Sequence, residues 1–220
     1  MTNKPKFIVI DGPDGSGKTT ICNHLKSLFE QDERKVIILK GLGSGKLGEI
    51  IRQEFFDKNL SETEVVLGIA LALAETNKLV QKYLDEGYNV ICDRYIGSYY
   101  VYQIKTFNLP NTHVIFDDIL LNLIQPDIYI TTNCDYKESK ERLRYRKEKN
   151  NWIDNLEKEK YDSVNYYYYK FYREVINKID SDNNIILDCD KSLLEVLKEI
   201  DDIYKNHLNL SLTSLESIKQ

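Results

Sequence analysis

The sequence has few cysteines and no long apolar run. No two of its four cysteines form a C-x-x-C pair, and most lie within apolar segments: Cys22, Cys92, Cys134 and Cys189. This pattern favours a reduced, cytoplasmic protein in which cysteine packs as a small hydrophobic residue. No window reaches the ~18 apolar residues of a membrane span, and the N-terminus enters a strand-like run rather than a cleavable signal. We therefore expect neither a membrane segment nor a secretion signal.

Basic residues are also fewer than acidic ones. Lys and Arg total 30 against 35 Asp and Glu, which gives a net charge of −5. This balance argues against a general attraction to nucleic acid, so any anionic ligand must be held by local basic groups. With 220 residues, 42% of them hydrophobic, the chain can bury one substantial core, and we expect a single domain over residues 1–220.

Short apolar runs alternate with helical patterns along the chain. Helical spacing of apolar residues covers 18–29 and 47–56, and a capping box at Ser61 and Glu64 begins a long helix that Gly87 ends. Buried-strand patterns occur at residues 7–10, 36–39, 89–92, 127–131 and 184–187. Because parallel strands need crossover connections, this order predicts an α/β fold: a five-stranded parallel sheet with helices on both faces.

A glycine-rich motif follows the first predicted strand. Residues 12–19 match G-x-x-x-x-G-K-S/T at every fixed position, directly before a predicted helix, which indicates a P-loop NTPase fold. In such a loop, backbone N–H groups and the helix N-terminus hold the phosphates of ATP, Lys18 neutralises transferring charge, and the Thr19 hydroxyl serves Mg²⁺. The expected ATP-binding residues are Gly12, Asp14, Gly15, Ser16, Gly17, Lys18, Thr19 and Thr20.

Two further features adjoin this loop. A carboxylate beside phosphates is costly unless it binds a sugar hydroxyl or orients a basic group, and for Asp14 we favour a substrate contact; Asp11 is expected to support the loop. A second glycine-rich stretch, 41–46, has spacing too short for a triphosphate site. Its position after the second strand suits an acceptor pocket, since ligands gather beyond the carboxyl ends of parallel strands.

An acid and a base end the third predicted strand. Asp93 could position water on Mg²⁺ or accept the acceptor's proton, and Arg94 could clamp the acceptor phosphate. A purely structural Asp–Arg pair is the alternative. The loop at 12–19 together with Asp93, Arg94, Tyr95, Ser98, Tyr102 and Gln103 resembles the thymidylate kinase family of nucleoside monophosphate kinases along nearly the whole chain.

That resemblance implies transfer of the γ-phosphate of MgATP to a deoxynucleoside monophosphate, with dTMP as the leading acceptor. It implies that Lys18, Asp93 and Arg94 are catalytic and that Thr19 and Asp93 serve the metal. In the segment 47–52, which is similar to the family's L-G-x-x-I-R, Arg52 becomes a second phosphate ligand, or else a solvated arginine. The implied substrate-binding residues are Asp14, Arg52, Gly68, Ala72, Arg94, Ser98, Tyr102 and Gln103.

The base-reading helix departs from the family pattern. Gly68 stands where a stacking aromatic is usual, and Ala72 where an arginine binds the thymine carbonyl. Without that hydrogen bond and that ring, the site discriminates less well between bases, so a purine or a bulky modified pyrimidine could enter. Glu75 and Asn77 could then read a different base. A neighbouring aromatic that refills the pocket is the other possibility.

The expected lid, at about 146–156, also lacks the family's usual Asp-Arg pair. Because the phosphate loop contains no arginine, charge compensation should fall to Arg142 and Arg146, which share a helix face, with Arg144 as the alternative. Residues 188–190 fall where the family packs adenine. The resemblance also implies a homodimer. A deoxynucleoside kinase and a decayed nucleotide-binding relative remain as competing interpretations.

Overall fold

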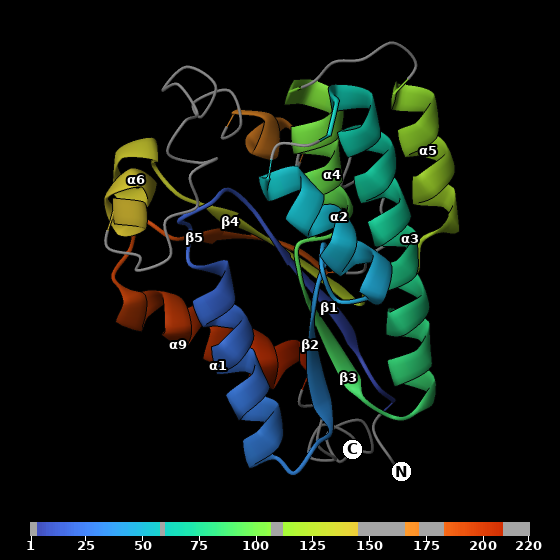
Figure 1. Ribbon diagram of the computed structural model, residues 1–220. Helices are drawn as coiled ribbons and strands as arrows, with labels where there is room; N and C mark the ends of the chain where they lie inside the picture. The colour runs from blue at the N-terminus through green and yellow to red at the C-terminus, as the bar shows by residue number, and fades with distance from the viewer. Residues whose placement is uncertain (1–3, 58–59, 107–111, 145–165, 172–182, 209–220) are drawn as a thin grey trace, which may run out of the picture.

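The computed structural model describes residues 4–57, 60–106, 112–144, 166–171 and 183–208 (Figure 1). All five strands are parallel and form one sheet in the order β2-β3-β1-β4-β5. Their bounds are β1 (Phe7–Asp11), β2 (Val36–Lys40), β3 (Asn89–Asp93), β4 (Ile128–Asn133) and β5 (Asn183–Asp188). The predicted α/β fold with five parallel strands is therefore confirmed, and each strand lies within one or two residues of its predicted position.

Helices cover both faces of this sheet. The described helices are α1 (Lys18–Gln31), α2 (Lys46–Phe56), α3 (Glu62–Asp85), α4 (Ile96–Tyr99), α5 (Thr112–Asn122), α6 (Tyr136–Arg144) and α9 (Leu193–Ile203). Two π-helical segments, Tyr100–Thr106 and Tyr204–Leu208, follow α4 and α9, and residues 166–171 are also helical. None of the helices in these ranges is long and apolar enough to cross a bilayer.

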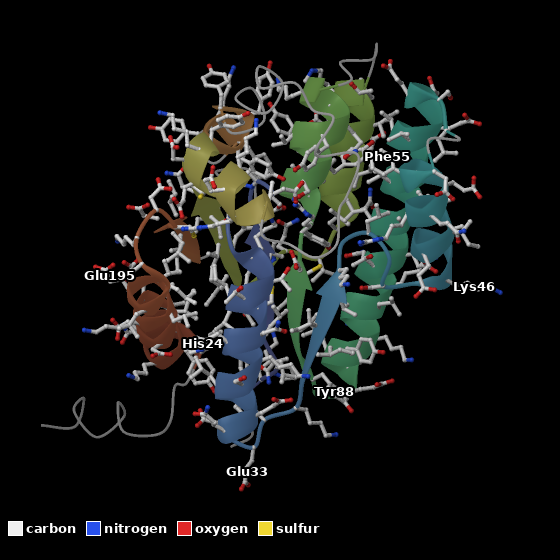
Figure 2. The ribbon with its side chains drawn as sticks, turned by 60° about the vertical axis from the view of Figure 1, so that its left-hand side comes forward. His24, Glu33, Lys46, Phe55, Tyr88 and Glu195 are labelled. Carbon is white, nitrogen blue, oxygen red and sulfur yellow. The ribbon has the colours of Figure 1, made fainter. Side chains whose placement is uncertain are left out.

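Each sheet face has its own apolar core. Ile8 and Ile10 of β1 point to one side, where α1 and α9 pack, and Phe7 and Val9 point to the other, where α3, α4 and α5 pack (Figure 1). This alternation follows from the two-residue period of a strand. Figure 2 shows His24 on the side of α1 that faces α9, where its Nε2 lies 2.7 Å from Asp201 Oδ1.

Local sequence signals begin and end the long helix α3. Ser61 accepts a hydrogen bond from the backbone N–H of Glu64, whose carboxylate accepts in return from the backbone N–H of Ser61 at 2.8 Å, so the predicted capping box is present. After the helix, Gly87 adopts a left-handed φ of 82°, which an L-residue rarely tolerates. These signals set the two ends of α3, which packs against β3, and β3 carries Asp93 to the edge where all five strands end.

Candidate active site

The phosphate loop connects β1 to α1. Gly17 directly precedes α1 with a left-handed φ of 91°, a conformation that favours glycine. Gly12 lies so close to β4 that a Cβ there would overlap the hydroxyl of Thr132. Ser16 is buried beneath the loop, where its Oγ is 2.6 Å from Thr132 Oγ1 and donates to the Pro13 carbonyl at 2.8 Å. The loop is thus hydrogen-bonded to β4, and α1 begins directly after it.

Lys18 lies inside this loop. Its side chain is buried, and Nζ donates to the Pro13 carbonyl at 2.5 Å. Burial, followed by the nearby positive charge of Arg94, lowers the pKa of Lys18 to about 8. A buried ammonium with so low a pKa gains from an incoming anion, because the anion restores both a partner and the charged form of the lysine.

Thr19 and Asp93 meet across the crevice. Thr19 Oγ1, on the first turn of α1, donates to Asp93 Oδ2 at 2.9 Å, and Thr20 beside it is exposed. A hydroxyl and a carboxylate oxygen are ligands that Mg²⁺ accepts together with phosphate oxygens and waters. The described part of the chain contains no cluster of three or more His, Cys, Asp or Glu side chains that could hold a metal ion.

Arg94 is enclosed by polar groups at the end of β3. It adopts a left-handed φ of 76°, a strained conformation for a residue that is not glycine. Its guanidinium forms an ion pair with Asp14 and donates through Nη1 to the Gly12 carbonyl (3.0 Å), Ser98 Oγ (3.0 Å) and Tyr168 Oη (3.2 Å). Burial alone would lower the pKa of Arg94, but the Asp14 carboxylate, with smaller contributions from Tyr102, Tyr168 and Asp93, raises it, and together they hold the pKa well above its usual value. The side chain therefore stays cationic.

Asp11 connects the phosphate loop to the turn that carries Arg94. Its side chain is buried, and Oδ1 accepts from the backbone N–H of Gly12 at 3.0 Å and from Ser98 Oγ at 2.5 Å. Oδ2 accepts from the backbone N–H groups of Tyr95 (3.1 Å) and Ser98 (3.0 Å) and from Tyr129 Oη (2.9 Å). One carboxylate thus takes five hydrogen bonds from the phosphate loop, β4 and the segment after β3.

The π-helical segment brings two more predicted residues to this edge. Tyr102 Oη donates to Asp14 Oδ2 at 3.2 Å, and its ring centroid lies 5.6 Å from Arg94 Cζ. Gln103, next in the chain, is buried. Such π turns recur at functional sites because they rotate side chains out of the α-helical register. Asp14 of the phosphate loop is therefore a neighbour of Arg94, Ser98 and Tyr102, although Arg94 lies 80 positions further along the chain.

Comparison with known proteins agrees with this geometry. The family model for thymidylate kinase matches residues 10–200. The chain belongs to the thymidylate kinase family. It is 32% identical to the thymidylate kinase of Thermosipho africanus over 92% of this chain and 98% of that protein. It is 30% identical to that of Thermoanaerobacter sp. over 93% of this chain and 100% of that protein, and 28% identical to that of Mesoplasma florum over 88% and 92%.

The two positions that depart from the thymidylate kinase pattern lie where α3 meets α2. A Cβ on Gly68 would approach Ile51 Cγ2 to 3.2 Å. Ala72 is 1% exposed, and its Cβ would lie 3.6 Å from a Cβ on Gly48. The small side chains on α3 therefore let α2 pack closely, and in these directions they open no space for a larger base.

Glu75 and Asn77 are engaged in structural contacts. Glu75 reaches the N-terminus of α2, where its carboxylate accepts from the backbone N–H groups of Leu47 (3.3 Å) and Gly48 (2.9 Å). The Asn77 side-chain oxygen accepts from Tyr95 Oη (2.9 Å) and from the backbone N–H of Ile124 (2.8 Å). Both side chains therefore already have hydrogen-bond partners within the protein.

Arg52, the second expected phosphate ligand, projects from α2 over the glycine-rich stretch 41–45. Its Nη1 donates to the Leu42 carbonyl at 3.4 Å, and its Cδ lies against Gly43. The structure therefore brings Arg52 to the loop after β2.

Arg142 lies over the ends of β4 and β5. It donates to the Cys189 carbonyl at 2.8 Å and to Cys134 Sγ at 3.6 Å, and its Nε pairs with Glu138 at 3.0 Å. This places Arg142 beside the segment expected to pack adenine. Arg146 and the expected lid at 146–156 lie outside the described residues, and α6 ends at Arg144.

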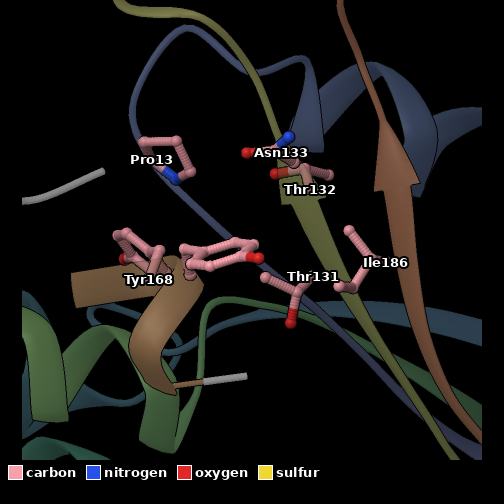
Figure 3. A pocket seen from close by; sticks show the side chains of 7 residues that line it. Pro13, Thr131, Thr132, Asn133, Tyr168 and Ile186 are labelled. Carbon is pink, nitrogen blue, oxygen red and sulfur yellow. The ribbon is translucent and has the colours of Figure 1, made fainter. Parts of the chain in front are cut away.

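A small pocket adjoins the phosphate loop, β4 and the helix at 166–171 (Figure 3). It is lined by Pro13, Thr131, Thr132, Asn133, Tyr168, Tyr169 and Ile186. Sequence reasoning missed Thr132 and Tyr168 as site residues. Thr132 carries no local signal, since a threonine on a buried strand is common. Tyr168 belongs to a run of four tyrosines at 166–169, a visible signal that did not reveal which ring faces the site.

Proposed function

We propose that this chain transfers the γ-phosphate of ATP to a deoxynucleoside monophosphate, with dTMP as the leading acceptor, to give dTDP and ADP. The observation that carries this proposal is the meeting of two phosphate-directed groups at one edge of the sheet. Lys18 belongs to the phosphate loop and Arg94 to the end of β3, and Gly12 of the loop accepts a hydrogen bond from Arg94. A donor and an acceptor phosphate held there lie close enough for transfer.

In this proposal the chain's residues position the two phosphates and stabilise charge rather than form covalent bonds. The loop N–H groups and Lys18 bind the donor phosphates, and Lys18 keeps its proton as negative charge develops. Arg94 binds the acceptor phosphate. Asp14 and Tyr102 lie beside Arg94, where the family contacts the sugar, and the Tyr102 ring supports the preference for a deoxyribose.

Magnesium fits the oxygen pair formed by Thr19 and Asp93, which we assign as its protein ligands. When bound, the ion supplies charge neutralisation to the phosphoryl oxygens. Arg142 and Arg146 remain the proposed sources of further positive charge from the lid helix. The position of Arg142 over Cys189 also supports a contact with the adenine of ATP.

A homodimer and a cytoplasmic location belong to the same proposal. Leu67 and Leu71 lie one turn apart on α3 and are each 52% exposed, as is Ile50 on α2, which gives these helices apolar surface to bury against a second copy. The four described cysteines are all free thiols, as in a reducing compartment. Sedimentation of the wild type and of Leu71→Glu tests the dimer, which the variant should weaken.

The deciding experiment measures ADP release with MgATP against a panel of deoxyribo- and ribonucleoside monophosphates and the corresponding nucleosides, with Lys18→Ala as the inactive control. Turnover with dTMP, and more slowly with its ribo counterpart, supports the proposal. Preference for another deoxynucleoside monophosphate retains the reaction and changes the base. Turnover with nucleosides alone, or no turnover with any acceptor, contradicts it.

A further inference from the structure

Tyr168 differs from its neighbours in the tyrosine run. Its side chain is 2% exposed, whereas Tyr166 is 60% exposed and Tyr169 is 43% exposed. The helix at 166–171 carries the Tyr168 ring toward the phosphate loop, beside Pro13 (Figure 3). The ring also meets Tyr102 edge-on, with 6.1 Å between their centroids. A residue 74 positions along the chain from Arg94 thus becomes part of the acceptor side of the site.

The hydroxyl of Tyr168 lies between two residues of the site. It is 3.2 Å from Arg94 Nη1 and 2.8 Å from Ser98 Oγ. A guanidinium only donates, so the tyrosine oxygen accepts from Arg94. Ser98 Oγ gives its own proton to Asp11 Oδ1 at 2.5 Å, so the Tyr168 hydroxyl donates to Ser98. The donors therefore point in one direction, from Arg94 through Tyr168 and Ser98 to Asp11.

We infer that Tyr168 is a positioning residue for Arg94, which holds the guanidinium in the orientation that receives the acceptor phosphate. The inference rests on the proposed function. Arginine has several rotatable bonds, and ordering them when substrate arrives would reduce affinity. Tyr168 and Ser98 restrict this motion before binding, while Asp14 holds the other terminal nitrogen. The Tyr168 hydroxyl stays protonated because burial, together with the nearby Tyr102 and Asp11, raises its pKa.

The test is Tyr168→Phe, which removes only the hydroxyl oxygen and keeps the ring against Tyr102. Calorimetry measures the Kd of dTMP and of thymidine, and steady-state assays measure KM for ATP. A hydrogen bond to a charged group predicts that dTMP binds about tenfold more weakly in the variant. Thymidine has no phosphate for Arg94 to hold, so its Kd and the KM for ATP should change less than about twofold. Tyr166→Phe, on the exposed side of the same helix, is the matched control and should match the wild type.

A double-mutant cycle shows whether Tyr168 acts through Arg94. In an Arg94→Lys background the planar fork is absent, so adding Tyr168→Phe should cost little more dTMP affinity. Equal losses for dTMP and thymidine, or losses that add fully in the double variant, would overturn the inference and leave a packing role. A wild type that neither binds nor phosphorylates any monophosphate would overturn the proposed function and this inference with it. If the wild type binds and phosphorylates a monophosphate and Tyr168→Phe binds dTMP as tightly as the wild type does, the inference alone is overturned.

Discussion

Replacing Asp11 with asparagine should strongly destabilise this protein. The two carboxylate oxygens accept five hydrogen bonds, three of them from backbone N–H groups. An asparagine side chain offers one acceptor oxygen, and its NH₂ must face at least one backbone donor, that of Gly12 on one side or those of Tyr95 and Ser98 on the other. Both orientations of the asparagine amide therefore leave buried donors without an acceptor.

The size of the effect follows from these bonds. Hydrogen bonds to a charged group contribute ~1.5 to 3 kcal/mol each, and the variant loses at least two, although relief from burying a charge offsets part of the loss. We expect Asp11→Asn to lower the free energy of unfolding by about 3 kcal/mol, measured by urea titration followed by circular dichroism.

Asp127→Asn is the matched control for this experiment. Asp127 lies at the opposite end of β1, where its carboxylate accepts from the backbone N–H of Phe7 and from Lys6 Nζ at 2.8 Å each, and its side chain is 33% exposed. Asp127→Asn should lower the free energy of unfolding by less than about 1 kcal/mol, because water can replace the missing partner. A loss for Asp11→Asn as small as that of the control would refute the assignment of Asp11 as the centre of the polar network.

Further predictions concern the loop and the α2–α3 contact. Lys18→Ala should lower kcat by about a thousandfold without lowering the melting temperature, because it removes transition-state stabilisation and a buried charge. In the free wild type, Lys18 loses its proton as pH rises through about 8, so ATP binding near that pH should take up a proton, seen as a buffer-dependent calorimetric enthalpy that Lys18→Ala lacks. Glu75→Gln should cost about 1 kcal/mol of unfolding free energy in urea, since it weakens the cap on α2. Ala72→Arg should lower the melting temperature by forcing α2 from α3, while raising the ratio of kcat/KM for dTMP over other monophosphates; an unchanged ratio means that residue 72 does not face the base.

The sheet and the phosphate loop could be predicted from sequence because their signals are local. An apolar run before a glycine-rich motif indicates a buried strand that leads into a phosphate loop. The capping box at Ser61 is complete within four residues. The parallel orientation of the strands then follows from the helices between them. The carboxyl ends of the strands necessarily meet at one edge, so Asp93 was predictable as a neighbour of the phosphate loop.

The contacts that hold the acceptor side were not predictable in this way. Tyr168 meets Arg94 through a helix whose facing side depends on the packing of the whole layer. The close approach of α2 to Gly68 and Ala72 is a matter of tertiary packing, and the sequence shows only that the side chains are small. A neighbouring helix can occupy the space beside small side chains, so the sequence alone leaves both an enlarged and a refilled base pocket open.

The carboxylate of Glu75 has a consequence for which anions the protein can hold. The chain contains two glycine-rich turns that each lead into a helix N-terminus, and free triphosphates do not distinguish such ends well. At α2 a tethered carboxylate already satisfies the backbone N–H groups of Leu47 and Gly48, and its effective concentration reaches the millimolar range or above. An ATP molecule must compete with this internal ligand at α2 but not at α1.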